Sequence, residues 1–145
     1  MREVPAPVCV VTVEVEGRHL GLTVNTLVSL SLEPPLVGIA VARQAALHEL
    51  LREAGAFGAS ILASGQEHLA QHFSRGVPPI ALWEGIDAHT GALGILLIEG
   101  ALGWIECRVA SEHPTGDHTF FVGEALSAEH GPGTEALVHL RQSYS

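Results

Sequence analysis

Hydroxyl and amide side chains recur within an otherwise apolar stretch between residues 20 and 32. They are Thr23, Asn25, Thr26, Ser29 and Ser31. A ligand with flat apolar faces and hydrogen-bonding edges would suit this mixture. A pair of strands with surface hydroxyl groups explains the same pattern, and composition alone favours that simpler explanation. Only the ligand interpretation makes this stretch a candidate binding site.

Arg43 follows an apolar run, residues 36–42, and comes directly before a helical pattern of leucines. A guanidinium beside a helix N-terminus is the combination that a phosphate group requires, because the positive charge and the unpaired backbone N–H groups both attract an anion. The sequence therefore predicts a phosphate contact at Arg43.

Histidines supply two further candidates. His68 and His72 are one helical turn apart and could hold a metal ion. Zinc needs at least a third protein ligand, which no spacing identifies, so solvated histidines are the favoured interpretation. Asp117 and His118 place an acid beside a histidine, although Asp next to Gly116 is common in hairpin turns that have no catalytic role.

Composition predicts one domain with an apolar surface. The 145 residues suffice for a single core and no linker divides them, so residues 1–145 are expected to form one domain. Hydrophobic residues make up 47% of the chain and charged residues only 16%, against a usual quarter. Too little charge remains to cover a small domain, so we expect a subunit interface to take the apolar surplus.

The charge balance argues against a nucleic-acid partner. Sixteen acidic residues outnumber seven basic ones, all arginine, and give a net charge of -9. A phosphate backbone would therefore be repelled.

Because no signal-peptide pattern and no apolar run of about eighteen residues occur, the sequence predicts a cytoplasmic protein with no membrane contact. Cys9 and Cys107 lie in apolar alternating stretches and are predicted to be buried, reduced thiols.

The first part of the chain has strand patterns. Residues 8–16 alternate between apolar and polar, which predicts a half-buried strand that ends in a turn at Gly17. Residues 29–33 predict a second strand with one polar face. Two prolines, residues 34–35, end its hydrogen-bonding ladder because neither has an N–H group.

Two short helices are predicted next. Residues 47–54 have helical spacing, and Gly55 supplies a C-terminal stop. Ser64 and Glu67 have the spacing of a capping box, which predicts a second helix through Ser74. The remaining expectations are strands at 57–63, 104–110, 118–125 and 137–140, a turn at 114–117, and a loop at 75–94. Six or seven strands with two small helices are most easily satisfied by an antiparallel barrel.

Four blocks of sequence together resemble one known family. They are GLTVNT at residues 21–26, SLSLEPPLV at 29–37, ELLREAG at 49–55 and GDHT at 116–119. In this order and at these spacings they resemble the flavin reductase-like family of FMN-binding split-barrel proteins, from about Val8 to the C-terminus. The resemblance implies a mainly β fold, an antiparallel six-stranded Greek-key split barrel with two short helices. It also implies a homodimer with FMN near the subunit interface, FAD and riboflavin being the alternative flavins.

The resemblance also assigns site residues. His118, in the Gly-Asp-His block, would lie where the nicotinamide of NAD(P)H approaches and orient it, because hydride transfer needs no general base. Residues 23–26 would line the isoalloxazine ring, residues 42–44 would lie at the ribityl-phosphate end, and Phe73 with Ser74 would flank the flavin. The complete set of implied cofactor-binding residues is Thr23, Val24, Asn25, Thr26, Ser29, Ala42, Arg43, Gln44, Phe73, Ser74 and Tyr144.

The chain departs from the family pattern in three places. Many members have a helix before the first strand, whereas here four residues, 1–4, precede Pro5-Ala6-Pro7. Members often carry Ser and Thr around the helix start, where this chain has Ala45 and Leu47. The loop at residues 75–88 contains two prolines and a tryptophan in place of a common Phe-x-Gly-like motif.

The resemblance predicts an NAD(P)H-dependent flavin reductase that supplies reduced flavin to a partner oxygenase or another acceptor. In that reaction C4 of the nicotinamide passes hydride to N5 of the flavin, while the protein stacks the rings and places N–H donors where charge develops. One alternative is an FMN-binding electron carrier without NAD(P)H oxidation activity of its own, which the altered loop and the missing N-terminal helix favour. Another is an apolar dimeric β module that binds no cofactor.

Overall fold

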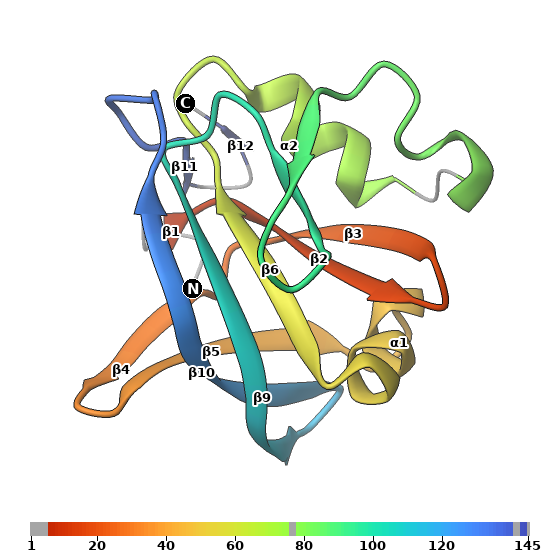
Figure 1. Ribbon diagram of the computed structural model, residues 1–145, viewed down its shortest axis with the longest axis vertical. Coiled ribbons are helices and arrows are strands. Elements are labelled where there is room, and N and C mark those ends of the chain that lie inside the picture. The colour runs from red at the N-terminus through yellow and green to blue at the C-terminus, as the bar shows by residue number, and fades with distance from the viewer. Residues whose placement is uncertain (1–5, 76–77, 141–142, 145) are drawn as a thin grey trace.

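The computed structural model describes residues 6–75, 78–140 and 143–144. Its main feature is an antiparallel seven-stranded sheet in the order β3-β2-β6-β9-β10-β5-β4, which bends around an apolar interior (Figure 1). The strands are β2 (Cys9–Val15), β3 (Arg18–Val24), β4 (Val28–Leu32), β5 (Pro35–Ala42), β6 (Ala56–Ile61), β9 (Gly103–Thr115) and β10 (His118–His130). The predicted mainly β, antiparallel fold with two short helices is confirmed, with seven strands in the main sheet where the resemblance implies six.

Two hairpins open the sheet. Glu16 and Gly17 join β2 to β3 with positive φ angles of 53° and 80°, which is the type I′ geometry that suits a two-residue turn, so the predicted turn is confirmed. β4 and β5 form the next hairpin, in which β5 begins at Pro35. A register shift between Ser29 and Ser31 interrupts the regular alternation expected for that strand.

The longest hairpin pairs β9 with β10. Each strand contains 13 residues, so both extend beyond the predicted ranges 104–110 and 118–125. Thr115 pairs with His118 across the turn, where Gly116 has a φ of 72°. Backbone pairing continues through exposed polar residues near this turn, and these residues carry no apolar pattern that would have indicated a strand.

Helix α1 (Ala46–Ala54) packs against one end of the sheet and buries Leu47, His48 and Leu51. Its predicted end is confirmed, since Gly55 adopts a left-handed conformation and its N–H donates to the Leu51 carbonyl at 3.0 Å. At its other end, the helix begins at Ala46, three residues after Arg43.

Helix α2 (Glu67–Ser74) covers the outer face of β2 and β3 (Figure 1). The predicted capping box at Ser64 is wrong, because Gln66 is the N-cap residue. The Glu67 carboxylate instead accepts the N–H of Gly65 at 2.8 Å, and the Gln66 side chain accepts the N–H of Ala63 at 2.9 Å. A tight turn, closed by the bond from the Gln66 N–H to the Ala63 carbonyl oxygen, thus replaces the expected pairing of Ser64 with Glu67.

The predicted loop at residues 75–94 contains structure that the sequence pattern did not indicate. It includes the 3-10 helix η1 (Pro79–Ala81) and strand β7 (Ala88–Thr90), which pairs with β8 (Leu96–Ile98). The buried Glu106 carboxylate accepts the backbone N–H groups of Ala92 and Leu93, at 3.1 and 2.9 Å, and so fixes the turn between β7 and β8.

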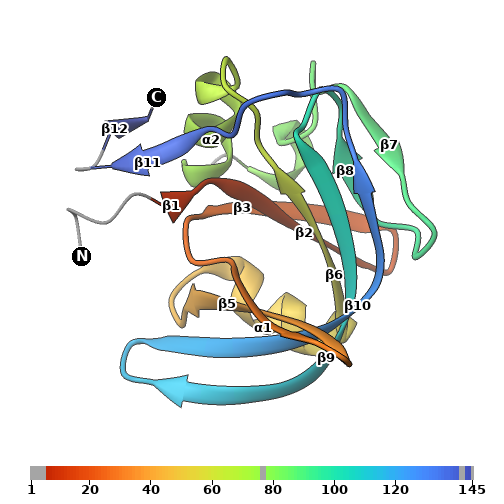
Figure 2. The ribbon, with the colours of Figure 1, turned by 90° about the vertical axis from the view of Figure 1, so that its left-hand side faces the viewer.

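The predicted closing strand at 137–140 is confirmed as β11 (Val138–Leu140). It lies between β1 (Ala6–Pro7) and β12 (Ser143–Tyr144) in a small separate sheet (Figure 2). The segments that precede β2 and end the described chain therefore lie side by side.

Strand β2 is buried on both faces, so the prediction of a half-buried strand is wrong. Val11 and Val13 belong to the interior core with Phe121, whereas Val10 packs with Phe73 of α2 in a second apolar cluster. The sequence of one strand cannot predict that its outer face is buried by a helix more than fifty residues later in the chain.

Both cysteines are buried and free, as predicted. Burial raises the pKa of Cys9 to about 12 and that of Cys107 also to about 12, the latter with a smaller contribution from the Glu106 charge. Neither thiol is therefore a nucleophile at neutral pH.

Candidate functional site

The connection between β3 and β4 is braced by two of the predicted flavin-binding residues. The Thr23 hydroxyl donates to the carbonyl oxygen of Ala70 in α2 at 2.7 Å. The Thr26 hydroxyl donates to the carbonyl oxygen of Ala40 in β5 and accepts the N–H of the same residue, both at 3.0 Å. These bonds hold the connection between α2 and β5, so both hydroxyls have a structural partner.

The other predicted residues in and beside this connection differ in exposure, Val24 being the last residue of β3 and Ser29 lying in β4. Val24 is buried in the core, so its backbone is the part that remains for a ligand. Asn25 and Ser29 are exposed and lie on either side of Thr26 in the sequence. The connection therefore presents an exposed polar surface on a firmly held backbone.

Phe73 and Ser74 lie at the end of α2, next to β3. Phe73 is almost completely buried, with its ring against Gly21 of β3 and 5.1 Å from the Trp83 ring centroid. The exposed Ser74 hydroxyl donates to the carbonyl oxygen of Gln71 at 2.9 Å. The predicted flavin-flanking role stays a prediction, in which Ser74 rather than the Phe73 ring offers accessible surface.

The predicted phosphate and nicotinamide residues lie on neighbouring strands. Ala42 of β5 pairs with His118 of β10, and the Arg43 N–H donates to the Asp117 carbonyl oxygen at 2.9 Å. His118 is partly exposed, and its Nδ1 lies 2.8 Å from the Asp117 carboxylate. The hydrogen bond from His118, followed by its charge, lowers the pKa of Asp117. Arg43 and the adjacent Gln44 are exposed.

Tyr144, the remaining predicted cofactor residue, lies in β12 and pairs with His139 of β11. This places its backbone in the small terminal sheet rather than in the main sheet. Its proposed contact with the cofactor stays a prediction.

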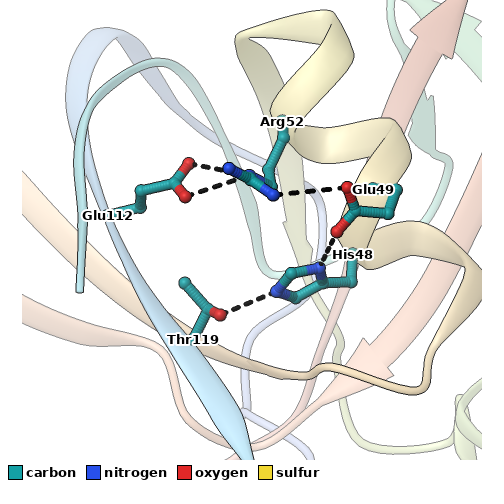
Figure 3. Close-up of polar contacts among 5 residues, drawn as sticks. All are labelled: His48, Glu49, Arg52, Glu112 and Thr119. Carbon is teal, nitrogen blue, oxygen red and sulfur yellow. Dashed lines mark hydrogen bonds and ion pairs between the residues drawn. The ribbon is translucent and has the colours of Figure 1, made fainter. Parts of the chain in front are cut away.

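A pocket of about 360 Å³ opens beside Arg43, between α1 and the β9–β10 hairpin. The residues that line it are Arg43, His48, Glu49, Arg52, Glu112, Pro114 and Thr119. Arg52 bridges two carboxylates, at 3.3 Å from Glu49 and 2.9 Å from Glu112 (Figure 3). Its charge is therefore already balanced.

Arg43 differs from Arg52 in this respect. No ion pair or side-chain hydrogen bond joins the Arg43 guanidinium to another residue in the described part of the chain. An exposed guanidinium at the mouth of a pocket and beside the start of α1 fits a phosphate group. The helix supplies no hydroxyl cap, because Ala45 is the N-cap residue, so the cation is the main feature that fits the anion.

Sequence reasoning missed His48. Its side chain is 7% exposed, its Nε2 lies 2.7 Å from the Thr119 hydroxyl and its Nδ1 lies 2.6 Å from the Glu49 carboxylate (Figure 3). The ring also meets Phe121 edge-on, with centroids 5.6 Å apart. A signal was present, because His48 follows Leu47 and precedes Leu51 by three residues, on the helix face that is otherwise apolar.

The histidine pair of α2 forms no metal centre with other described side chains. No group of three or more His, Cys, Asp or Glu residues in residues 6–75, 78–140 and 143–144 could hold an ion. His68 is exposed, but His72 is not a solvated side chain, since its Nε2–H donates to the Leu82 carbonyl at 2.7 Å.

None of the described helices is long and apolar enough to cross a membrane.

Comparison with solved structures identifies the fold. The NADH:FAD oxidoreductase of Streptomyces globisporus, solved with NAD and FAD fragments, superposes with a TM-score of 0.94 at 34% sequence identity, over 99% of this chain and 86% of that one. The architecture is thus shared with an oxidoreductase that takes a nicotinamide and a flavin. The flavin reductase like domain family matches residues 1–145, and the chain belongs to this family.

Two curated relatives are similar over most of their length. The reductase component of 4-hydroxyphenylacetate 3-monooxygenase from Thermus thermophilus is 38% identical over 94% of this chain and 85% of the relative. The NADH-dependent FMN reductase of Agrobacterium fabrum is 36% identical over 87% of this chain and 71% of the relative. The family resemblance seen in the four sequence blocks is confirmed.

Proposed function

We propose that this protein is an NAD(P)H-dependent flavin reductase whose reduced flavin serves a separate acceptor. The carrying observation is Arg43, an exposed cation without a carboxylate partner among the described residues, at the start of α1 and in register with the strand that carries His118. Membership of the flavin reductase like family and relatives that use NADH with FMN or FAD support the same proposal.

The phosphate of FMN would bind at Arg43, with Gln44 beside it, and the ring would lie against the exposed connection that carries Asn25 and Ser29. Thr23 and Thr26 would then act mainly by fixing that connection, because their hydroxyls already bond to α2 and β5. FMN has a ring with polar edges at one end and a phosphate at the other. The ring matches the exposed polar connection, and the phosphate matches the Arg43 cation.

His118 would orient the nicotinamide. It is partly exposed, and the Asp117 carboxylate holds its Nδ1 as the protonated nitrogen, so Nε2 remains for a ligand. Bound together, the two cofactors supply the redox chemistry, which is hydride transfer from the reduced nicotinamide to the flavin. The protein has to place the rings in contact and exclude competing reactions.

We infer a homodimer from the edge strand β4. Val28, Leu30 and Leu32 are 43%, 45% and 88% exposed there, although they are large and apolar. An exposed apolar edge strand calls for a partner surface.

The Thermus relative is the reductase component of a monooxygenase, which supports an oxygenase as the acceptor of reduced flavin. Two buried, reduced cysteines agree with a cytoplasmic location.

One titration tests the activity. The visible spectrum of the purified protein is recorded before and after FMN is added, and then after NADH is added under nitrogen. A reductase binds FMN and bleaches it with NADH, and it oxidises NADH in the presence of added flavin. A protein that binds FMN and oxidises no NADH or NADPH would instead be the electron carrier, and one that binds no flavin would refute both functions.

A further inference from the structure

We propose that His48 is a positioning residue for the phosphate end of the flavin site. It would act through Thr119, by holding the start of α1 against β10 so that Arg43 faces the pocket. This inference rests on the proposed flavin function. It concerns a buried polar pair in the wall of the pocket, whose role would be to position Arg43 and not to take part in hydride transfer.

The His48 imidazole is fixed on three sides. Thr119 and Glu49 bond to its two nitrogens, at 2.7 and 2.6 Å, and the ring of Phe121 packs against it. Counted as whole residues, backbone included, His48 and Thr119 are each 5% exposed. A hydrogen bond between two buried side chains defines their relative position more strictly than apolar packing does, because either partner would lose its bond on moving away.

The bond joins the two segments that carry the candidate site. On one side, Arg43 lies five residues before His48, and the N–H of His48 donates to the Ala45 carbonyl at 3.0 Å in the turn between them. On the other side, Thr119 directly follows His118. The contact between His48 and Thr119 therefore adds a side-chain tie to the backbone bond between Arg43 and Asp117.

Glu49 determines which His48 nitrogen carries the proton. An ionised carboxylate only accepts hydrogen bonds, so Nδ1 must be the donor, and in the neutral ring Nε2 then accepts the Thr119 hydroxyl proton. Arg52 of α1 binds Glu49 one turn away on the same helix, and Glu112 of β9 binds Arg52 in turn (Figure 3). Each member of the chain thus has a partner, as a positioning network requires.

Thr119→Val is the main test, because it keeps the shape of the side chain and removes the hydroxyl. We expect FMN affinity to fall by roughly two- to tenfold, the value of one hydrogen bond, while riboflavin affinity stays unchanged because riboflavin has no phosphate. Thr119→Ser restores the hydroxyl and should restore FMN affinity. His48→Gln, which keeps a polar group near the Nε2 position, should retain more affinity than His48→Leu.

Thr12→Val is the matched control. Thr12 is also a buried strand threonine, and its hydroxyl donates to the Leu96 carbonyl at 2.8 Å, away from the residues that line the pocket. This variant should lose stability without a change in FMN affinity. Equal losses for FMN and riboflavin in Thr119→Val, or no loss for either, would overturn the positioning role. Wild-type protein that binds neither flavin would refute the proposed function itself, and equal affinity for both flavins would refute the Arg43 contact on which the positioning role depends.

Discussion

The N–H of Arg43 donates to the carbonyl oxygen of Asp117 at 2.9 Å, although the two residues are far apart in the sequence. This bond continues the ladder in which Ala42 pairs with His118, so the start of α1 and the turn of the β9–β10 hairpin share one fixed framework. Arg43, expected at the flavin phosphate, and His118, expected at the nicotinamide, are therefore held in a fixed relative position. Substituting each residue by itself should show which cofactor it serves.

Arg43→Ala should weaken FMN binding by about 1.5–3 kcal/mol and hardly affect riboflavin, because a charge-assisted bond to the phosphate is lost. Isothermal titration with both flavins measures the difference. Arg52→Ala is the informative comparison, since Arg52 lines the same pocket but is bound to Glu49 and Glu112. A larger loss of FMN affinity in Arg52→Ala than in Arg43→Ala would assign the phosphate contact to Arg52.

His118→Ala should slow hydride transfer from NADH by on the order of tenfold, the effect of one lost orienting bond, and change FMN affinity less. Rapid-mixing absorbance of bound flavin after addition of NADH gives the rate. His113→Ala, on the exposed part of β9, serves as the control. If the rate and FMN affinity fell by the same factor in His118→Ala, the residue would belong to the flavin site or to folding instead.

Local signals in the sequence were sufficient for some elements. The spacing of leucines and Gly55 predicted α1 and its end, and Gly17 predicted the first hairpin turn. These features depend on residues within one turn of each other. The capping box predicted at Ser64 was wrong although it is also a local feature. Gln66 competes for the N-cap position, and the sequence does not show which residue takes it.

The polar contacts that define the pocket could not be predicted in this way. His48 and Thr119 are 71 residues apart. The Thr26 hydroxyl likewise bonds to Ala40 of β5, 14 residues further along the chain, outside the pocket. Such bonds depend on strand order and register, which one sequence does not contain. The resemblance assigned cofactor roles to Arg43 and His118, which stay predictions, and it gave no role to His48.

Glu106→Ala should lower the free energy of unfolding by about 2–4 kcal/mol, because it leaves the N–H groups of Ala92 and Leu93 without their acceptor. The carboxylate is buried, so water replaces it poorly. Urea unfolding measures the loss, with the exposed Glu129→Ala as the control. Equal stability of these two variants would show that the turn between β7 and β8 needs no carboxylate.

The acid sensitivity of α1 should depend on Glu49. The hydrogen bond from His48, followed by the Arg52 charge, lowers the Glu49 pKa below its usual 4.5. A lowered carboxylate pKa gives a stabilising contribution that is fully present above the unfolded pKa and is lost as pH falls through the folded pKa. The difference in urea midpoint between wild type and Glu49→Gln should therefore be largest near neutral pH and shrink below about pH 4.

A control separates Glu49 from other acids. Asp117 also has a lowered pKa and contributes acid sensitivity in both proteins, so the difference between variants is the relevant quantity. Glu53→Gln changes an exposed acid on the same helix and should give no pH-dependent difference. A constant difference between wild type and Glu49→Gln from pH 3 to pH 7 would contradict a stabilising role of the Glu49 contacts with His48 and Arg52.

Leu32→Glu should turn the proposed homodimer into a monomer. Leu32 is 88% exposed on edge strand β4, and a leucine side chain buried at an interface contributes about 1.5–3 kcal/mol, so its loss weakens association by about tenfold or more before charge repulsion is added. Light scattering over a dilution series measures the change. Ile80→Glu is a matched control, because Ile80 is 93% exposed and lies in η1 rather than on β4. A wild-type protein that is monomeric with flavin bound would refute the proposed dimer, and equal dissociation of both variants would mean that β4 is not the interface.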